Sequence, residues 1–164
     1  MPSRPEDDDV CNGPSFIVDG MLGDVARWLR IMGYDTLYLS DADDEEILRA
    51  SANRILLTSD EELYRRAIKH GTEAFLIPEG TLLGKLRSVS RRYGLSSKMS
   101  GSRCTACNGT LVKATPENIP ASKGILPIHV GEVWSCTGCG KLYWRGSHWK
   151  GIERTLREVT LPPT

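Results

Sequence analysis

Four cysteines fall into two pairs whose spacing is typical of a metal site. Cys104 and Cys107 form one Cys-x-x-Cys pair, Cys136 and Cys139 form the other, and 28 residues separate the pairs. A tight turn between paired cysteines delivers two thiolates to one ion, and Zn²⁺ prefers four such ligands in a tetrahedron. Because four cysteine ligands leave no open position for water, we predict one structural zinc ion and not a catalytic one.

Short segments with strand character flank the cysteine pairs and predict a zinc ribbon. These segments are 110–113, 132–136 and 141–144. Gly109 and Gly140 come just after the second cysteine of each pair, where such a turn often requires a positive φ. A redox pair or unligated core thiols would not explain two matched pairs, and the fifth cysteine, Cys11, stands apart from them.

Aspartates at the ends of predicted strands form a second candidate site. Asp19 follows the apolar run 16–18, and Asp60 follows the run 54–58. Three more lie between the second predicted strand and the helix after it: Asp41, Asp43 and Asp44. Because the carboxyl ends of parallel strands meet at one edge of a sheet, we expect these side chains to converge there on Mg²⁺ or Mn²⁺. Such an ion can activate water and neutralise charge on a phosphodiester, whereas each aspartate taken alone is equally a helix cap.

The elements that must position these residues alternate between strand and helix. Apolar runs predict strands at 16–18, 36–39, 54–58 and 74–77. Helical periodicity and end signals predict helices within 19–35, 41–53, 59–71 and 81–94. Four strand–helix units in succession predict an α/β fold, a small parallel sheet covered by helices. A last helix, with Ser147 as its cap, is predicted after the ribbon.

The length of 164 residues suits one α/β domain and a small module. The predicted parts are a disordered leader (1–14), the α/β domain (15–95), a linker and zinc ribbon (96–146), and a C-terminal helix and tail (147–164). No apolar run approaches the roughly 20 residues that cross a bilayer, and residues 1–15 are polar and acidic. We therefore expect a cytoplasmic protein with no membrane partner, and its oligomeric state is open.

Charge is divided unevenly along the chain, although the formal net charge is zero. Residues 1–79 contain 17 acidic and 8 basic side chains, and residues 80–164 contain 4 acidic and 13 basic ones. A basic half of this kind suits a polyanion such as nucleic acid, but it also suits attraction between the two halves of the molecule.

Five segments, in this order, closely resemble the Mut-seven C-terminal RNase family: FIVDGMLGDVARWLRIMGYDT, DDEEIL, RILLTSDEEL, CTACNGTL and WSCTGCGKLYWRGSHW. They extend from about Phe16 to Trp149. Members of that family look like a PIN-fold nuclease followed by a zinc ribbon. The resemblance therefore implies a PIN-like α/β domain, an RNA substrate and metal-dependent hydrolysis of phosphodiesters.

The resemblance also implies roles for single residues. The acids that match the family's motifs are Asp19, Asp60, Asp44 and, as an adjacent candidate, Asp43. Ser59 stands where the family often has an arginine, which removes one potential phosphate contact but leaves the carboxylates in place. Arg27 and Arg30 match arginines of the first helix, where they either grip phosphate or pair with local acids.

Together these features predict a metal-dependent endoribonuclease whose zinc ribbon aids RNA binding. Further candidate contacts to RNA are Arg87, Arg91, Arg92, Lys98, Trp144 and His148. The expected partner is RNA, with ribosomal or transfer RNA as candidates and the target open; ribosomal RNA is suggested by analogy with the PIN-plus-ribbon endonuclease of small-subunit rRNA processing. Two alternatives stand beside this prediction: a non-catalytic RNA- or ribosome-binding adaptor, and a toxin-like ribonuclease of the kind that many short PIN domains are.

Overall fold

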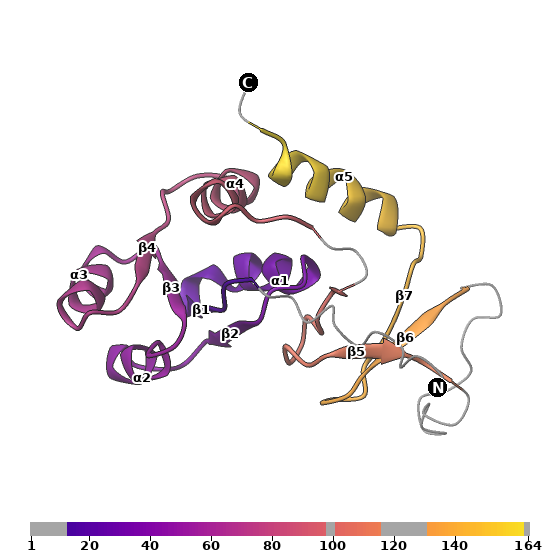
Figure 1. Ribbon diagram of the computed structural model, residues 1–164, viewed down its shortest axis with the longest axis horizontal. Coiled ribbons are helices and arrows are strands. Elements are labelled where there is room, and N and C mark those ends of the chain that lie inside the picture. The colour runs from indigo at the N-terminus through magenta and orange to yellow at the C-terminus, as the bar shows by residue number, and fades with distance from the viewer. Residues whose placement is uncertain (1–12, 98–100, 116–130, 163–164) are drawn as a thin grey trace, which may run out of the picture.

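Two sheets, one parallel and one antiparallel, define the structure (Figure 1). The computed structural model describes residues 13–97, 101–115 and 131–162. The α/β part contains β1 (Phe16–Asp19), the 3₁₀ turn η1 (Gly20–Leu22), α1 (Gly23–Ile31), β2 (Thr36–Leu39), α2 (Asp44–Ala50), β3 (Ile55–Thr58), α3 (Glu61–Lys69), β4 (Ala74–Leu76) and α4 (Leu82–Tyr93). The remainder contains β5 (Leu111–Lys113), β6 (Val133–Cys136), β7 (Leu142–Trp144) and α5 (Trp149–Thr160). The predicted α/β class, with a parallel sheet flanked by helices, is confirmed.

The parallel sheet is covered by helices on both faces because its central strands are apolar on both faces. Phe16 and Val18 of β1 join one core with α1 and α4, and Ile17 between them joins a second core with α2 and α3. Side chains alternate across a strand, so a continuous apolar run requires cover on each side. The result is a three-layer arrangement of helix, sheet and helix, which Figure 1 shows nearly along the strands.

The order of the parallel strands, β2-β1-β3-β4, creates a topological switch point between β1 and β3. The chain passes from β1 outward to β2, and from β3 outward to β4, so the connections after two neighbouring strands diverge. In open α/β sheets, ligands bind outside the carboxyl ends of the strands at such a switch point. Here those ends are at Asp19 and Thr58.

Side-chain caps fix where three of the helices begin. Asp43 caps α2, Asp60 caps α3 and Thr81 caps α4, each accepting a hydrogen bond from a backbone N–H of the first turn. After β1 the chain instead makes the 3₁₀ turn η1, so α1 begins at Gly23 without a side-chain cap.

The C-terminal helix α5 leaves the ribbon and packs on α4, as Figure 1 shows. Its buried residues Leu156 and Val159 belong to the same core as Leu86 and Val89 of α4. The predicted cap is wrong: His148, not Ser147, is the N-cap of α5, and its side chain makes no capping hydrogen bond. The helix is therefore stabilised by the packing of its apolar face and not by a side-chain cap at its N-terminus.

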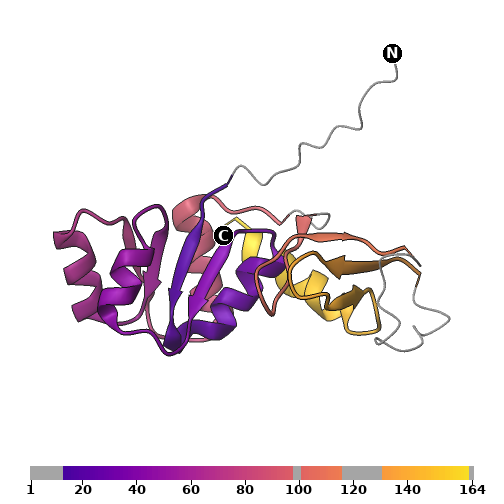
Figure 2. The same cartoon turned by 90° about the horizontal axis from the view of Figure 1, so that it is seen from below.

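The antiparallel sheet has the order β5-β6-β7 and carries the cysteine pairs. In the view from below, the α/β layers lie at one end of the molecule and this ribbon at the other (Figure 2). Across the described ranges, no helix is both long enough and apolar enough to cross a membrane. The division of the chain into the predicted domains stays a prediction, although α5 belongs to the α/β core.

Candidate functional site

The four paired cysteines form one compact cluster. Their Sγ atoms lie within 4.8 Å of one another, with Cys104 Sγ 3.6 Å from Cys139 Sγ and Cys107 Sγ 3.4 Å from Cys136 Sγ. Four thiolates each about 2.3 Å from a zinc ion stand about 3.8 Å apart at the corners of a tetrahedron. The cluster can therefore hold a zinc ion, and within the described ranges no other group of three or more potential ligands is close enough for one ion.

Hydrogen-bond donors around the Cys104 sulfur favour its thiolate, which is the form that binds metal. The Tyr143 hydroxyl lies 3.0 Å from Cys104 Sγ and accepts a hydrogen bond from the Thr105 amide. Burial raises the pKa of Cys104, but hydrogen bonds from Tyr143 and from the amides of Cys107 and Ala106 outweigh burial and lower this pKa to about 6.

The turn after the first cysteine pair differs from the predicted one. Asn108, not Gly109, has the positive φ, 68°, and Gly140 has φ 73° in the second turn. Asn tolerates the left-handed region because its short polar side chain bonds locally. Gly109 is required for another reason: a Cβ there would lie 2.6 Å from Cys136 Sγ.

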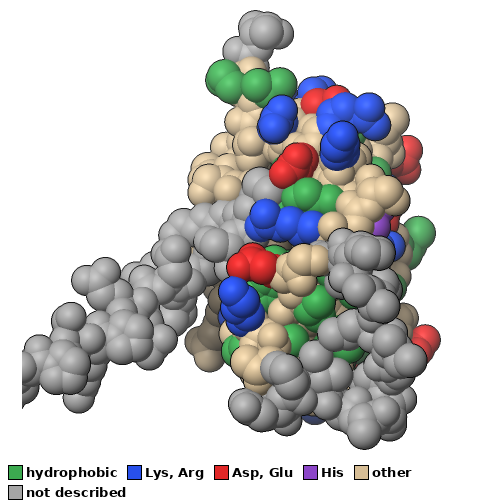
Figure 3. All heavy atoms as spheres, turned by 90° about the vertical axis from the view of Figure 1, so that its right-hand side faces the viewer, with side chains coloured by type: hydrophobic (Ala, Val, Ile, Leu, Met, Phe, Trp, Pro, Cys, Tyr) green, Lys and Arg blue, Asp and Glu red, His purple; other side chains and the backbone are tan. Residues whose placement is uncertain are grey.

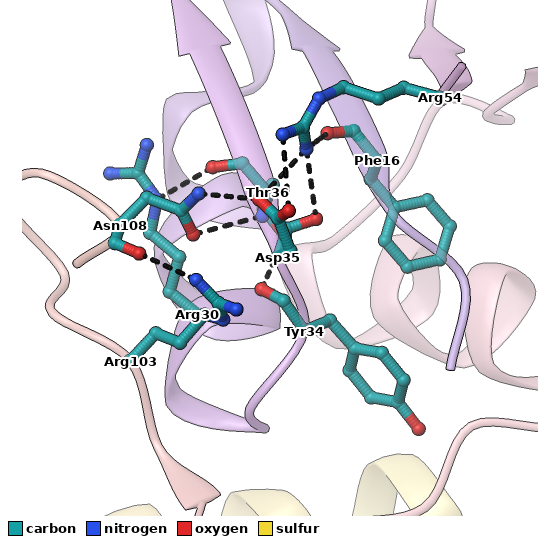
Figure 4. A network of polar contacts seen from close by, with 8 residues as sticks. All are labelled: Phe16, Arg30, Tyr34, Asp35, Thr36, Arg54, Arg103 and Asn108. Atoms are coloured by element: carbon teal, nitrogen blue, oxygen red, sulfur yellow. Dashed lines mark hydrogen bonds and ion pairs between the residues drawn. The ribbon is translucent and has the colours of Figure 1, made fainter. Parts of the chain in front are cut away.

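Asn108 also joins the ribbon to the edge of the parallel sheet (Figure 4). Its Oδ1 accepts a hydrogen bond from the Thr36 amide at 2.9 Å, and its Nδ2 donates to Asp35 Oδ1 at 2.6 Å. Asp35 in turn receives two hydrogen bonds from Arg54, at 2.8 and 3.1 Å. Partial burial raises the pKa of Asp35, but the bonds from Arg54 and Asn108 outweigh burial and hold this pKa below its ordinary value.

Arg30 is the second link between the ribbon and the α/β layers, and its predicted contact with RNA is wrong. The side chain is buried, with 6% of the residue exposed. Its Nε donates to the Thr36 carbonyl and its Nη1 donates to the Thr105 carbonyl, both at 2.9 Å. A guanidinium that serves two backbone carbonyls in the interior cannot reach a phosphate in solvent. Figure 4 shows Arg30 within this interface, among the residues that join the two parts.

Two of the predicted acids, Asp19 and Asp60, follow the strand ends at the switch point of the sheet and share Thr58 as a hydrogen-bond partner. Thr58 Oγ1 donates to Asp19 Oδ2 at 2.8 Å and accepts from the Asp60 amide at 3.0 Å. Asp60 Oδ1 takes the capping hydrogen bonds from the amides of α3. Asp19 Oδ1 and Asp60 Oδ2 have no hydrogen-bond partner within the described residues, so each carboxylate keeps one oxygen for a cation or water.

The sequence around this edge brings its loops close together. Gly20, directly after Asp19, lets the chain pass beside the end of β2, because a Cβ there would lie 2.8 Å from the Ser40 carbonyl oxygen. The Tyr38 hydroxyl donates to the Gly20 carbonyl at 2.8 Å and fixes this approach. The predicted convergence of the loops after β1 and β2 thus has a local cause in one glycine and one tyrosine.

The other predicted acids are engaged elsewhere. Asp44 Oδ2 forms an ion pair with Arg66 Nη1 of α3 at 2.7 Å. Asp43 Oδ1 accepts from the Glu46 amide as the cap of α2, and Asp41 accepts from the Ser40 hydroxyl. As described, Asp19, Asp44 and Asp60 do not form a three-ligand group for one ion. Asp44 is paired with Arg66 instead, and the sequence pattern did not single out this arginine.

The remaining predicted RNA contacts have three different positions. Arg27, Trp144 and His148 border a cleft between α1, the ribbon and α5. Arg91 and Arg92 are exposed on α4, and Arg92 lies over the Tyr93 ring. Arg87 donates through Nε to the Glu158 carbonyl of α5 at 2.9 Å, so it fixes a helix end. Lys98 lies outside the described residues.

Sequence reasoning missed Asn108, Asp35, Arg54 and Arg66. Each is polar and unremarkable in its local sequence, and each acts through a partner at least 19 residues away. The only local signal was that asparagine tolerates the left-handed region, although the positive φ of this turn was predicted at Gly109.

One family model, described as the Mut7-C RNAse domain, matches residues 14–156. That range includes β1 through most of α5, the acids at the switch point and all four paired cysteines. Neither the curated proteins nor the solved structures gave a match.

Proposed function

Because the chain belongs to the Mut7-C RNAse domain family, whose model spans most of its length, we propose that it is a metal-dependent endoribonuclease. The family supports a nuclease or RNA-related role. The finer proposal is that catalysis occurs at the carboxyl edge of the parallel sheet, with the cysteine cluster as a structural zinc site.

The observation that carries this proposal is the pair of carboxylates at the switch point. Asp19 and Asp60 follow neighbouring parallel strands, and the buried Thr58 hydroxyl donates to the Asp19 carboxylate and accepts from the Asp60 backbone amide. Each retains one oxygen for a cation, and oxygen ligands are those that Mg²⁺ prefers. A divalent ion held there would supply an activated water and neutralise charge on the phosphodiester.

The chain's own residues orient that site. Thr58 holds the Asp19 carboxylate in one rotamer, and the amides of α3 hold Asp60. Asp44 is the third candidate ligand, and its pairing with Arg66 neutralises its charge in the metal-free protein. Arg66 makes one bond to Asp44 and one to Glu45, and we infer that binding of RNA and metal moves it from Asp44 toward phosphate, which a guanidinium can bind in a bidentate way.

A cleavage assay on circular single-stranded RNA tests the proposal, because a circle has no ends for an exonuclease. We expect the zinc-loaded protein to open the circle with Mn²⁺ or Mg²⁺ and not with EDTA. Asp19→Asn is expected to slow cleavage by more than about 100-fold, since changes to the residues behind metal ligands already cost 10- to 100-fold.

Glu73→Gln is the matched control, because it removes one acidic charge at the opposite edge of the same sheet. It is expected to cleave at the wild-type rate. Cleavage by Asp19→Asn at the rate of Glu73→Gln would remove Asp19 from the active site. Binding of RNA without metal-dependent cleavage by the wild type would favour the adaptor alternative.

A further inference from the structure

A cleft of about 220 Å³ lies where the ribbon, α1 and α5 meet. Basic and aromatic side chains line it: Arg27 from α1, Trp134, Lys141, Tyr143 and Arg145 from the ribbon, and Trp149 from α5. Ile31 and Ile152 complete its apolar wall. The cleft is smaller than the roughly 300–1,000 Å³ of pockets that enclose drug-sized ligands, so it suits a single planar group.

The pairing of β6 and β7 gathers the ribbon's contribution on one face. Trp134 pairs with Tyr143 across the strands, so the two side chains share a face. Lys141 and Arg145, two residues before and after Tyr143, lie on that face too. The Lys141 Nζ lies 5.4 Å from the Tyr143 ring centre, which agrees with this placement. Trp144 pairs with Val133 and alternates to the other face of the strand, although it also lines the cleft.

The aromatic rings form flat surfaces with a cation between them. The Arg145 guanidinium lies 5.6 Å from the Trp134 ring centre and 5.0 Å from the Trp149 ring centre. Trp149 is fixed in turn, because its Nε1 donates to Glu153 at 3.0 Å. Indole and guanidinium planes held in this way are surfaces on which nucleic-acid bases stack.

All charged residues that line the cleft are basic. Within the described ranges, Arg27, Lys141 and Arg145 have no ion pair with a carboxylate. In the space-filling view of this end of the molecule, Lys and Arg side chains lie among hydrophobic ones (Figure 3). Cations that have no ion pair and lie beside stacking surfaces match the chemistry of a base joined to a phosphate.

We propose that this cleft binds one unpaired base, with its adjoining phosphate, of single-stranded RNA. The proposal rests on the proposed function for the identity of the polymer and deepens it by assigning a substrate subsite. Arg27 lies four residues, or about 6 Å of helix rise, from the start of α1 beside the catalytic edge. A strand held in the cleft would therefore pass along α1 toward Asp19, and unpaired RNA would be selected over duplex.

Fluorescence anisotropy with a labelled single-stranded RNA octamer, in EDTA-free buffer without added divalent ions, measures binding apart from cleavage. Trp149→Leu is expected to weaken binding about 5- to 150-fold, the range for loss of one aromatic stacking surface. Trp149→Phe loses the bond to Glu153. Because it keeps an aromatic face for stacking, it is expected to bind within about twofold of wild type. Arg27→Gln is expected to weaken binding and to lower the slope of log Kd on log salt by about 0.7.

Arg49→Gln is the charge-matched control, because Arg49 is exposed on α2, away from the cleft. Tryptophan emission reports directly on the cleft, since three of the four tryptophans border it. Single-stranded RNA is expected to quench this emission, and duplex RNA of the same sequence is not. Equal quenching by single-stranded DNA would assign the cleft to unpaired nucleic acid in general and overturn its restriction to RNA.

The proposal is overturned if the octamer does not quench tryptophan emission, or if Trp149→Leu and Trp149→Phe bind equally well. Either result leaves the nuclease proposal standing, provided Asp19→Asn abolishes cleavage of circular RNA. The opposite result is also possible: the octamer quenches the wild type and Trp149→Leu weakens its binding, but the wild type shows no metal-dependent cleavage. The cleft would then be an RNA site and the nuclease proposal would fail.

Discussion

Arg27 and Arg30 lie one turn apart on α1 and have opposite surroundings. Arg27 is exposed at the cleft, whereas Arg30 is buried and donates to carbonyls of β2 and of the first cysteine turn. Burial lowers the pKa of Arg30, while the nearby sulfurs of Cys104 and Cys107 raise it. At the residue scale, arginine therefore acts either at the surface, as Arg27 does, or in the interior, as Arg30 does, according to which carbonyls lie within its reach.

Arg30→Met is expected to lower the free energy of unfolding by about 2–4 kcal/mol, since it leaves two carbonyls without their charged donor. Urea unfolding followed by circular dichroism measures this change. Arg27→Met is the matched control on the same helix and is expected to change stability by less than about 0.5 kcal/mol. Equal effects of the two substitutions would contradict the assignment of Arg30 as an interior link.

At the element scale, α5 completes the α/β core although it follows the ribbon in the chain. Leu156 and Val159 are buried on α4, and Arg87 of α4 bonds the Glu158 carbonyl near the end of α5. In the sequence the ribbon lies between α4 and α5, so the packing of these two helices links it to the α/β layers. The ribbon is thus tied to the α/β layers by α5, by the side chains of Arg30 and Asn108, and by hydrogen bonds from Ser102 and Arg103 to the end of α1.

Leu156→Ala is expected to destabilise the α/β core by about 2–5 kcal/mol, the usual cost of removing a buried leucine side chain. Thermal or urea unfolding of the zinc-loaded protein measures it. Arg154→Ala, on the exposed face of the same helix, is expected to have little effect. If both variants unfold at the same denaturant concentration, α5 is not part of the core.

The elements themselves could be predicted from sequence, and their partners could not. Strands such as 36–39 and helices such as α2 carry local signals: apolar runs, acidic first turns and the capping Asp43. The docking of α5, the pairing of Asp44 with Arg66 and the burial of Arg30 depend on residues far apart in the chain. Local patterns contain no information on such contacts, which is why the acids were found but their actual hydrogen bonds were not.

At the scale of the whole molecule, the two candidate metal sites lie at different places and have different chemistry. The cysteine cluster is closed and joins the start of β2 through Asn108. The carboxylates lie at the opposite edge of the sheet, where β1 and β3 end. We propose that zinc fixes the ribbon and its RNA cleft, while a second, weaker ion acts at the carboxylates.

The zinc site is tested by metal analysis of the purified chain. We expect one zinc per chain, and we expect Cys136→Ser to lose it because a thiolate ligand is removed. Cys11→Ser is the matched control, since Cys11 is the only cysteine outside the two pairs. Retention of a full zinc equivalent by Cys136→Ser would show that the cluster does not hold the metal.

Binding of Mn²⁺ to the zinc-loaded protein, followed by electron paramagnetic resonance, tests the central claim most directly. We predict one or two Mn²⁺ ions per wild-type chain, a loss of that binding in Asp19→Asn and in Asp60→Asn, and wild-type binding in Glu73→Gln. The same Mn²⁺ binding in wild type, Asp19→Asn and Asp60→Asn would contradict a catalytic metal site at the carboxyl edge of the sheet.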